Sequence, residues 1–133
     1  MPDHLYLDDF APGQRFSHPV SPIMDLARIK QFAAEFDPQP FHVDEEAAAS
    51  HPVFGGLAAS GWHTAAVTAR LLVESVPFAG GLIGLGVEVS WPRPTRAGDQ
   101  LSVATEVMEV TLSRSNADRG VVTLRTETRN QRG

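Results

Sequence analysis

The chain has 133 residues, 42% of them hydrophobic and 20% charged, which predicts a single globular domain over residues 1–133 rather than a disordered chain. Its net charge of −5 argues against nucleic-acid binding, and the absence of cysteine excludes disulfides, thiolate metal sites and a cysteine nucleophile. Neither a signal peptide nor an apolar run of roughly 20 residues is present, so we expect a soluble, cytoplasmic protein that does not bind membranes.

The first 50 residues predict one short strand and two helical segments. Residues 14–20 fit a short strand, residues 24–36 a helix, and residues 44–50 a short acidic helical turn. Apolar side chains of the 24–36 segment recur on one predicted buried face at Leu26, Ile29, Ala33 and Phe36. Pro38 and Pro40 should end that helix, because proline disfavours helical backbone in the residue before it.

Residues 61–76 carry the clearest helical pattern of the chain. Ser60 is a natural N-cap for this helix, and Pro77 marks its end. A broad stripe of small and apolar side chains is the face that we expect to be buried: Trp62, Ala65, Ala66, Ala69, Leu72, Val73 and Val76. Its alanines would let the helix lie close to a flat surface.

The rest of the chain is rich in β-formers. Residues 81–91, 100–110 and 119–128 are the predicted strands, separated by the loops 92–99 and 113–118. Leu101, Val103, Thr105 and Val107 should share one face, and so should Val122, Leu124 and Thr126. One long helix against antiparallel strands predicts an α+β layer architecture.

Residues 36–46, FDPQPFHVDEE, carry the candidate chemistry. Asp37 and His42 are separated by two prolines, so a turn is needed between them and could aim both side chains into one pocket. A carboxylate and an imidazole that face one water form a workable general acid/base pair, because imidazole titrates close to neutral pH.

This segment resembles the hydratase motif of MaoC-like and R-specific enoyl-CoA hydratase proteins. The family pattern runs Asp, any residue, Asn, Pro, an apolar residue, His, any residue, and Asp or Glu. The matching residues here are Asp37, Pro38, Gln39, Pro40, Phe41, His42, Val43 and Asp44. Gln39 replaces the usual Asn, and Phe36 stands where Gly or Ser is common.

Two further segments are similar to the same family, in the same order. Residues 54–64, FGGLAASGWHT, resemble the segment that ends in His-Gly at the start of the central helix, with Ser60 in place of His. Residues 87–101 resemble its strand, proline, Gly-Asp and strand signature. Some members carry a polar residue two turns into the helix, where this chain has Ala69.

The resemblance implies a hot-dog fold, in which an antiparallel sheet wraps around a central helix. It also implies a homodimer or higher homo-oligomer with active sites near the subunit interface. In the family the chain continues after a segment like residues 130–133 into one last strand. The sequence ends at Gly133, so we expect this edge strand to be cut off, absent or supplied otherwise.

The resemblance further implies a carbon-oxygen lyase that acts on 2-enoyl and 3-hydroxyacyl thioesters, with R stereochemistry. Asp37 and His42 would activate a water for addition to C3, and the backbone N–H of Gly61 would stabilise the thioester oxyanion. The expected substrate-binding residues are Gln39, Pro40, Phe41, Ser60 and Trp62. An acyl-CoA or acyl-carrier thioester would be the substrate, and neither a metal nor a bound cofactor is needed.

Plainer readings of the same residues remain open. Asp37 could only cap a turn, and Ser60 is better read as an N-cap than as a nucleophile. His51 and His63 have no metal-site spacing to His42. The glycines of GLIGLG, residues 81–86, fit close strand–helix packing better than a nucleotide loop, and Arg93 and Arg96 fit solvated loop charges better than CoA phosphate contacts.

Two other functions compete with hydration. A hot-dog acyl-CoA thioesterase would use a carboxylate to direct water at the carbonyl, and it would release a free thiol. A subunit without catalysis would only bind acyl thioesters or a partner chain. The Asp37 and His42 pairing favours hydration over both.

Overall fold

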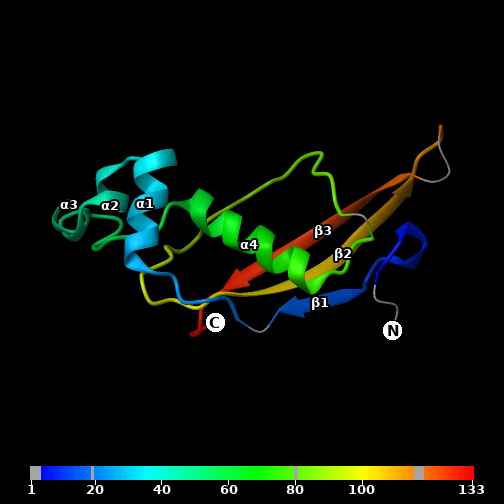
Figure 1. Cartoon of the computed structure of the whole chain (residues 1–133), viewed down its shortest axis with the longest axis horizontal. Helices are drawn as coiled ribbons and strands as arrows, with labels where there is room; N and C mark the ends of the chain where they lie inside the picture. The colour runs from blue at the N-terminus through cyan, green and yellow to red at the C-terminus, as the bar shows by residue number, and fades with distance from the viewer. Residues whose placement is uncertain (1–3, 19, 80, 116–118) are drawn as a thin grey trace.

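The computed structural model describes residues 4–18, 20–79, 81–115 and 119–133. A three-stranded antiparallel sheet, in the order β1-β2-β3, packs against one long helix, α4 (Figure 1). The elements are η1 (Leu7–Asp9), β1 (Arg15–His18), α1 (Leu26–Phe36), α2 (Pro40–Val43), α3 (Glu45–Ala49), α4 (Gly61–Ser75), β2 (Ser102–Leu112) and β3 (Gly120–Arg129). The predicted α+β class is confirmed.

Strand β2 is the centre of the sheet. It pairs with β1 through Arg15 opposite Glu106, and with β3 along its whole length, interrupted by one irregularity between Val107 and Glu109. The predicted inward face is confirmed: Leu101, Val103, Thr105 and Val107 are all buried. Alternate side chains of a strand point to the same side of the sheet, so these four residues form one face. Helix α4 packs on that face.

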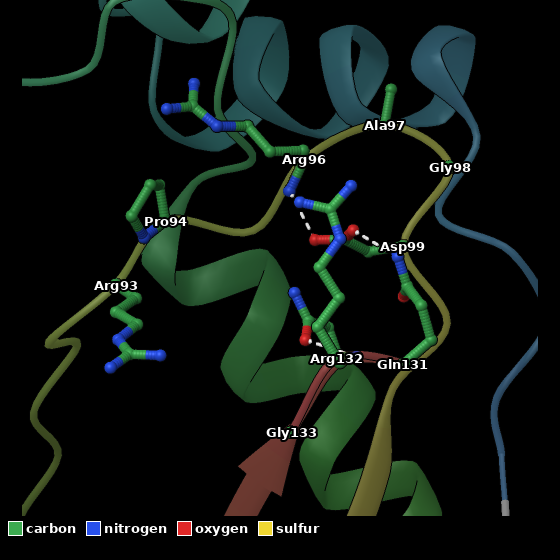
Figure 2. A pocket seen from close by; sticks show the side chains of 10 residues that line it. Arg93, Pro94, Arg96, Ala97, Gly98, Asp99, Gln131, Arg132 and Gly133 are labelled. Atoms are coloured by element: carbon green, nitrogen blue, oxygen red, sulfur yellow. Dashed lines mark hydrogen bonds between the residues drawn. The ribbon is translucent and has the colours of Figure 1, made fainter.

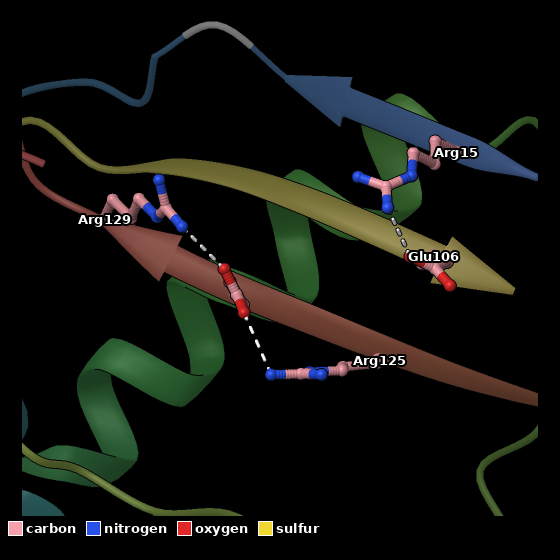
Figure 3. Close-up of polar contacts among 5 residues, drawn as sticks. Arg15, Glu106, Arg125 and Arg129 are labelled. Carbon is pink, nitrogen blue, oxygen red and sulfur yellow. Dashed lines mark hydrogen bonds and ion pairs between the residues drawn. The ribbon is translucent and has the colours of Figure 1, made fainter. Parts of the chain in front are cut away.

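The opposite face of the sheet is charged (Figure 3). Arg15 pairs with Glu106 at 2.9 Å, and Glu127 pairs with Arg125 at 3.1 Å and with Arg129 at 2.8 Å. Exposed pairs of this kind contribute about 0–1 kcal/mol each. They therefore mark the side of the sheet that faces water and leave the other side as the core.

Only part of the predicted stripe of α4 is buried: Val76 is fully buried and Leu72 packs against the core, but other members of the stripe face outward. Trp62 is 58% exposed and Val73 is 56% exposed, whereas Leu71, outside that stripe, is 1% exposed. Ala66 and Ala69 are exposed as well. The helix is thus rotated about its axis relative to the apolar pattern.

Paired hydroxyl groups explain this rotation. Thr68 Oγ1 is 2.7 Å from Thr128 Oγ1 on β3, and Thr64 Oγ1 donates to Thr95 Oγ1 at 3.0 Å. A polar group can be turned inward at little cost when it finds a hydrogen-bond partner there. The two threonines can therefore lie on the inner side of α4, which apolarity alone did not indicate.

Helix α1 is confirmed, but only half of its predicted buried face is buried. Asp25 caps it by accepting from the Ala27 N–H at 2.8 Å. Ile29 and Ala33 are fully buried, whereas Leu26 and Phe36 are 37% and 65% exposed. Ile29 joins α1 to the apolar cluster shared with α4 and β2: Met24, Ile29, Ala59, Leu71, Leu101 and Val103.

The predicted strand at residues 81–91 does not form. Figure 1 shows this segment running back past α4, outside the three-stranded sheet. Its large apolar side chains are exposed: Leu82, Ile83, Leu85, Val87, Val89 and Trp91. The composition indicated an extended backbone, but a strand also needs a neighbouring strand, and none of the described residues provides one.

The remaining predicted elements agree with the structure. The strands predicted at 14–20, 100–110 and 119–128 are β1, β2 and β3, and the acidic turn at 44–50 is α3. Part of the predicted loop 113–118 lies outside the described residues. No helix in the described part of the chain combines the length and the hydropathy that crossing a bilayer requires.

Candidate active site

The segment after α1 brings Asp37 and His42 together. Asp37 is the C-cap of α1, and α2 begins at Pro40. We expected the prolines to exclude helix here, which is wrong for Pro40, because the first helical position tolerates proline. The break at residues 37–39 and the short helix α2 place His42 Nε2 3.4 Å from Asp37 Oδ2.

The carboxylate of Asp37 is held on both oxygens. Gln39 Nε2 donates to Oδ1 at 2.6 Å, and Ser60 Oγ donates to Oδ2 at 2.7 Å. Burial raises the pKa of Asp37, but the hydrogen bonds from Ser60 and Gln39 and the nearby His42 outweigh it and lower the pKa below its usual value. Asp37 is therefore ionised at neutral pH.

The imidazole of His42 is 5% exposed and held by the backbone. Its Nδ1 lies 2.6 Å from the Ala58 carbonyl, and the Ala58 N–H donates to the Phe41 carbonyl at 3.1 Å. A carbonyl can only accept, so Nδ1 carries the proton. Nε2, the other ring nitrogen, faces Asp37 Oδ2 at 3.4 Å and is therefore the nitrogen that can exchange a proton on this side of the ring.

Ser60 connects Asp37 to the start of α4. Its side chain is fully buried, donates its single proton to Asp37 and accepts from the Trp62 N–H at 3.2 Å. The predicted N-cap is confirmed. The contact with Asp37 was not predicted, because nothing local in the sequence relates residues 23 positions apart.

Gly61 is the first residue of α4, and its backbone N–H has no acceptor among the described residues. Free N–H groups and a partial positive charge are typical of a helix N-terminus. A Cβ at Gly61 would lie 2.7 Å from Trp91 Cε2, so glycine is needed for the indole to pack here. Trp62 meets Trp91 edge-on, at 5.1 Å between ring centroids.

The five predicted substrate-binding residues divide into two groups. Gln39 and Ser60 contact Asp37 directly. Pro40 lies exposed at the start of α2, Phe41 stacks on Phe54 at 4.6 Å, and Trp62 is exposed beside Trp91. Among the described residues, no side-chain hydrogen bond joins these last three to Asp37 or His42.

Arg96 is a residue whose place the sequence did not predict. We expected a solvated charge, but Arg96 is half-buried, and its guanidinium donates to the carbonyls of Phe54, Gly56 and Leu57. Figure 2 shows Arg96, Arg93 and Arg132 pointing in different directions. They line a cavity of about 480 Å³, formed by residues 93, 94, 96–99 and 130–133.

His51 and His63 make contacts outside the Asp37 and His42 pair. His51 Nδ1 accepts from the backbone N–H groups of Val53 and Phe54, at 3.1 and 3.2 Å. His63 stacks on Phe32, and burial together with Arg28 lowers its pKa. Among the described residues, no three His, Asp or Glu side chains gather around a possible metal position.

Comparison with known proteins gives concordant matches. The model of the MaoC like domain family matches residues 9–130. A MaoC-like dehydratase from Rhodospirillum rubrum is 58% identical, with a TM-score of 0.91 over 97% of this chain and 88% of that chain. The uncharacterized protein YdeM of Bacillus subtilis is 36% identical over 131 residues, covering 96% of this chain and 89% of YdeM.

Two hydratases are also similar in structure. R-hydratase PhaJ1 from Pseudomonas aeruginosa is 27% identical, with a TM-score of 0.75 over 98% of this chain and 78% of that chain. An (R)-hydratase from A. caviae, involved in PHA biosynthesis, is 29% identical, with a TM-score of 0.72 over 93% of this chain and 88% of that chain.

Proposed function

The chain belongs to the MaoC-like domain family and has its hot-dog fold, and from this premise we propose that it is a hydratase/dehydratase of 2-enoyl and 3-hydroxyacyl thioesters. One observation carries the proposal. The Asp37 carboxylate and His42 Nε2 lie 3.4 Å apart, beside the free N–H of Gly61 at the start of α4. An acid/base pair and an oxyanion donor are the two parts that hydration requires.

In the proposed reaction, one water lies beside the Asp37 and His42 contact and hydrogen-bonds to both side chains. As the water oxygen bonds to C3, one O–H bond breaks and the pair accepts that proton. The same pair then returns one proton to C2, so it ends with the protons it began with. Dehydration is the reverse. Nδ1 of His42 keeps its proton throughout, since the Ala58 carbonyl holds it.

The Gly61 N–H is the proposed oxyanion donor. As C3 is attacked, negative charge moves through C2 onto the thioester oxygen. A preorganised N–H at a helix N-terminus stabilises this charge, and one such donor typically contributes on the order of 3 kcal/mol. The lack of another acceptor for this N–H supports the assignment.

The proposal extends to substrate and stereochemistry. We assign an acyl-CoA or acyl-carrier thioester and R stereochemistry, supported by the likeness to two R-hydratases. Gln39, Pro40, Phe41, Ser60 and Trp62 are the proposed contacts around the thioester. The mechanism draws on side chains and backbone of this chain only. A cytoplasmic location is part of the proposal and is in keeping with the cysteine-free sequence.

A homodimer is also part of the proposal. Ile83, Leu85 and Val87 are 86%, 77% and 81% exposed on an extended segment for which the described residues provide no strand partner. A contiguous exposed apolar surface is characteristic of a subunit interface. We propose that a second copy of the chain covers this segment.

The deciding experiment follows the enoyl absorbance of a short 2-enoyl-CoA in the ultraviolet. We expect the absorbance to fall without release of free thiol, and Asp37→Asn or His42→Ala to slow the reaction roughly a hundredfold to ten-thousandfold. Asp8→Asn and His4→Ala, both at exposed positions, are matched controls with unchanged rates. Thiol release would instead indicate a thioesterase. No reaction with short, long and branched thioesters would refute an enzymatic role on these substrates.

A further inference from the structure

We propose that Arg96 is a positioning residue for His42: by binding three carbonyls of residues 54–57, it holds the Ala58 carbonyl where His42 needs it. The kinetic consequence rests on the proposed function. The effect on the state of the His42 ring does not, so the two can be tested separately.

The contact between Arg96 and the 54–57 loop is a clamp of three hydrogen bonds. Nη1 donates to the carbonyls of Gly56 at 2.7 Å and Leu57 at 3.2 Å, and Nη2 donates to the carbonyl of Phe54. No carboxylate pairs with this guanidinium among the described residues. The positive charge is therefore directed wholly at backbone oxygens.

Among the described residues, no donor other than Arg96 reaches those three carbonyls. A backbone carbonyl removed from water needs a donor, and a loop offers none of the regular ones. A planar guanidinium with several N–H groups can serve all three at once, whereas a lysine ammonium is a point charge on a flexible stem.

Arg96 is itself well anchored. Its backbone N–H donates to Asp99 Oδ2 at 2.9 Å, and Asp99 Oδ1 accepts from Gln131 Nε2 at 3.2 Å. Asp99 is buried, at 7% exposure. One residue earlier, the Thr95 carbonyl accepts from the Ala59 N–H at 2.8 Å. Hydrogen bonds therefore hold the 95–99 loop in place on both sides of Arg96, at Thr95 and at Asp99.

The clamp reaches the proposed active site through one peptide. Leu57, whose carbonyl Arg96 binds, precedes Ala58, whose carbonyl lies 2.6 Å from His42 Nδ1. That contact decides which ring nitrogen carries the proton and which one faces Asp37. A shift of the loop would release Nδ1, so that the ring could turn or change tautomer. His42 would then occupy a mixture of ring orientations and tautomers, and only some of them would place the correct nitrogen toward the water.

The experiment compares two variants. Arg96→Gln removes both the positive charge and the planar guanidinium, whereas Arg96→Lys keeps the charge and removes only the guanidinium. Arg93→Gln is the matched control, because Arg93 lies on the same loop, is exposed and makes no ion pair among the described residues. Nitrogen-15 NMR of the histidine rings reports the tautomer, and His42→Ala identifies the His42 signals among the five histidines. Thermal unfolding checks that each variant is folded.

We expect wild type and Arg93→Gln to hold His42 with its proton on Nδ1, and both Arg96 variants to show mixed tautomers. On a 2-enoyl-CoA, kcat should fall roughly tenfold to a hundredfold in both Arg96 variants with KM nearly unchanged, the usual cost of a misplaced catalytic group. A folded Arg96→Gln with an unchanged tautomer would overturn the inference; if it does not fold, Arg96→Lys decides. A wild type that hydrates nothing would overturn the proposed function, and the NMR result would still decide the clamp.

Discussion

Both carboxylate oxygens of Asp37 have partners that stabilise its ionised form. Gln39 and Ser60 each donate to one oxygen, and His42 stands beside Oδ2. These donors outweigh the burial of the side chain, and the pKa of Asp37 falls below its usual value. Because the folded pKa is depressed, Asp37 stabilises the folded state above the pKa of the unfolded chain. That contribution disappears as pH falls through the folded pKa.

Replacing Ser60 by alanine should change the acidic side of the pH–rate profile. The loss of one donor raises the pKa of Asp37, so the acidic limb of kcat/KM moves to higher pH. The change also removes the N-cap of α4 and costs about 1 kcal/mol of stability. Ser50→Ala, at an exposed serine that caps α3, is the matched control. An acidic limb that stays in place in Ser60→Ala would contradict the role assigned to the Ser60 hydroxyl.

At the scale of the elements, α1 and α4 illustrate one limit of an apolar pattern. The pattern placed both helices in the sequence, with ends close to those observed. It did not decide which apolar residues are buried, since several positions on each helix look equally suitable. Tertiary contacts made the choice: the paired threonines of α4 turn inward, and Phe36 of α1 remains exposed.

Two substitutions on α1 test this choice. Ile29 is fully buried and Leu26 is 37% exposed, although the pattern assigns both to one face. Ile29→Ala should lower the free energy of unfolding by about 3 kcal/mol, since it removes buried methyl groups and leaves a cavity. Leu26→Ala should cost less than about 1 kcal/mol. Urea unfolding measures both, and equal losses would contradict the burial that the structure assigns.

Over the whole molecule, the most unusual surface is the extended segment 81–91. The sheet ends at β3, and this segment passes α4 with its apolar side chains exposed. Exposed apolar surface is costly in water, because it forfeits roughly 25 cal/mol for each Å² that could be buried. A covering subunit removes this cost, as proposed above.

The exposed apolar segment 81–91 leads us to expect a dimer in solution. Light scattering during size-exclusion chromatography should give twice the 14.4 kDa chain mass. Val87→Glu should shift the protein to monomer, since it places a charge in the proposed interface. Val53→Glu is the matched control, because Val53 is 79% exposed and Val87 is 81% exposed. A monomeric wild type, or a Val87→Glu variant that stays dimeric, would contradict the proposed interface.

The sequence by itself determined helices α1, α3 and α4, the two long strands and the Asp37 and His42 pair, because these depend on periodicity, capping residues and a motif only six residues long. Such signals act between residues close in the chain, where backbone preference and spacing are set locally. The family resemblance drew on the same short segments. Its fold is confirmed, and the roles of the site residues stay predictions.

Only the tertiary structure decided what each side chain meets. Ser60 reaches Asp37 across 23 positions, and Arg96 reaches the Gly56 carbonyl across 40. It also decided which face of α4 is buried and that residues 81–91 have no strand partner in the part of the chain that the structure describes. Hydrogen-bond partners and burial depend on segments that come together on folding, and no local pattern of one segment specifies the chemistry of its distant neighbour.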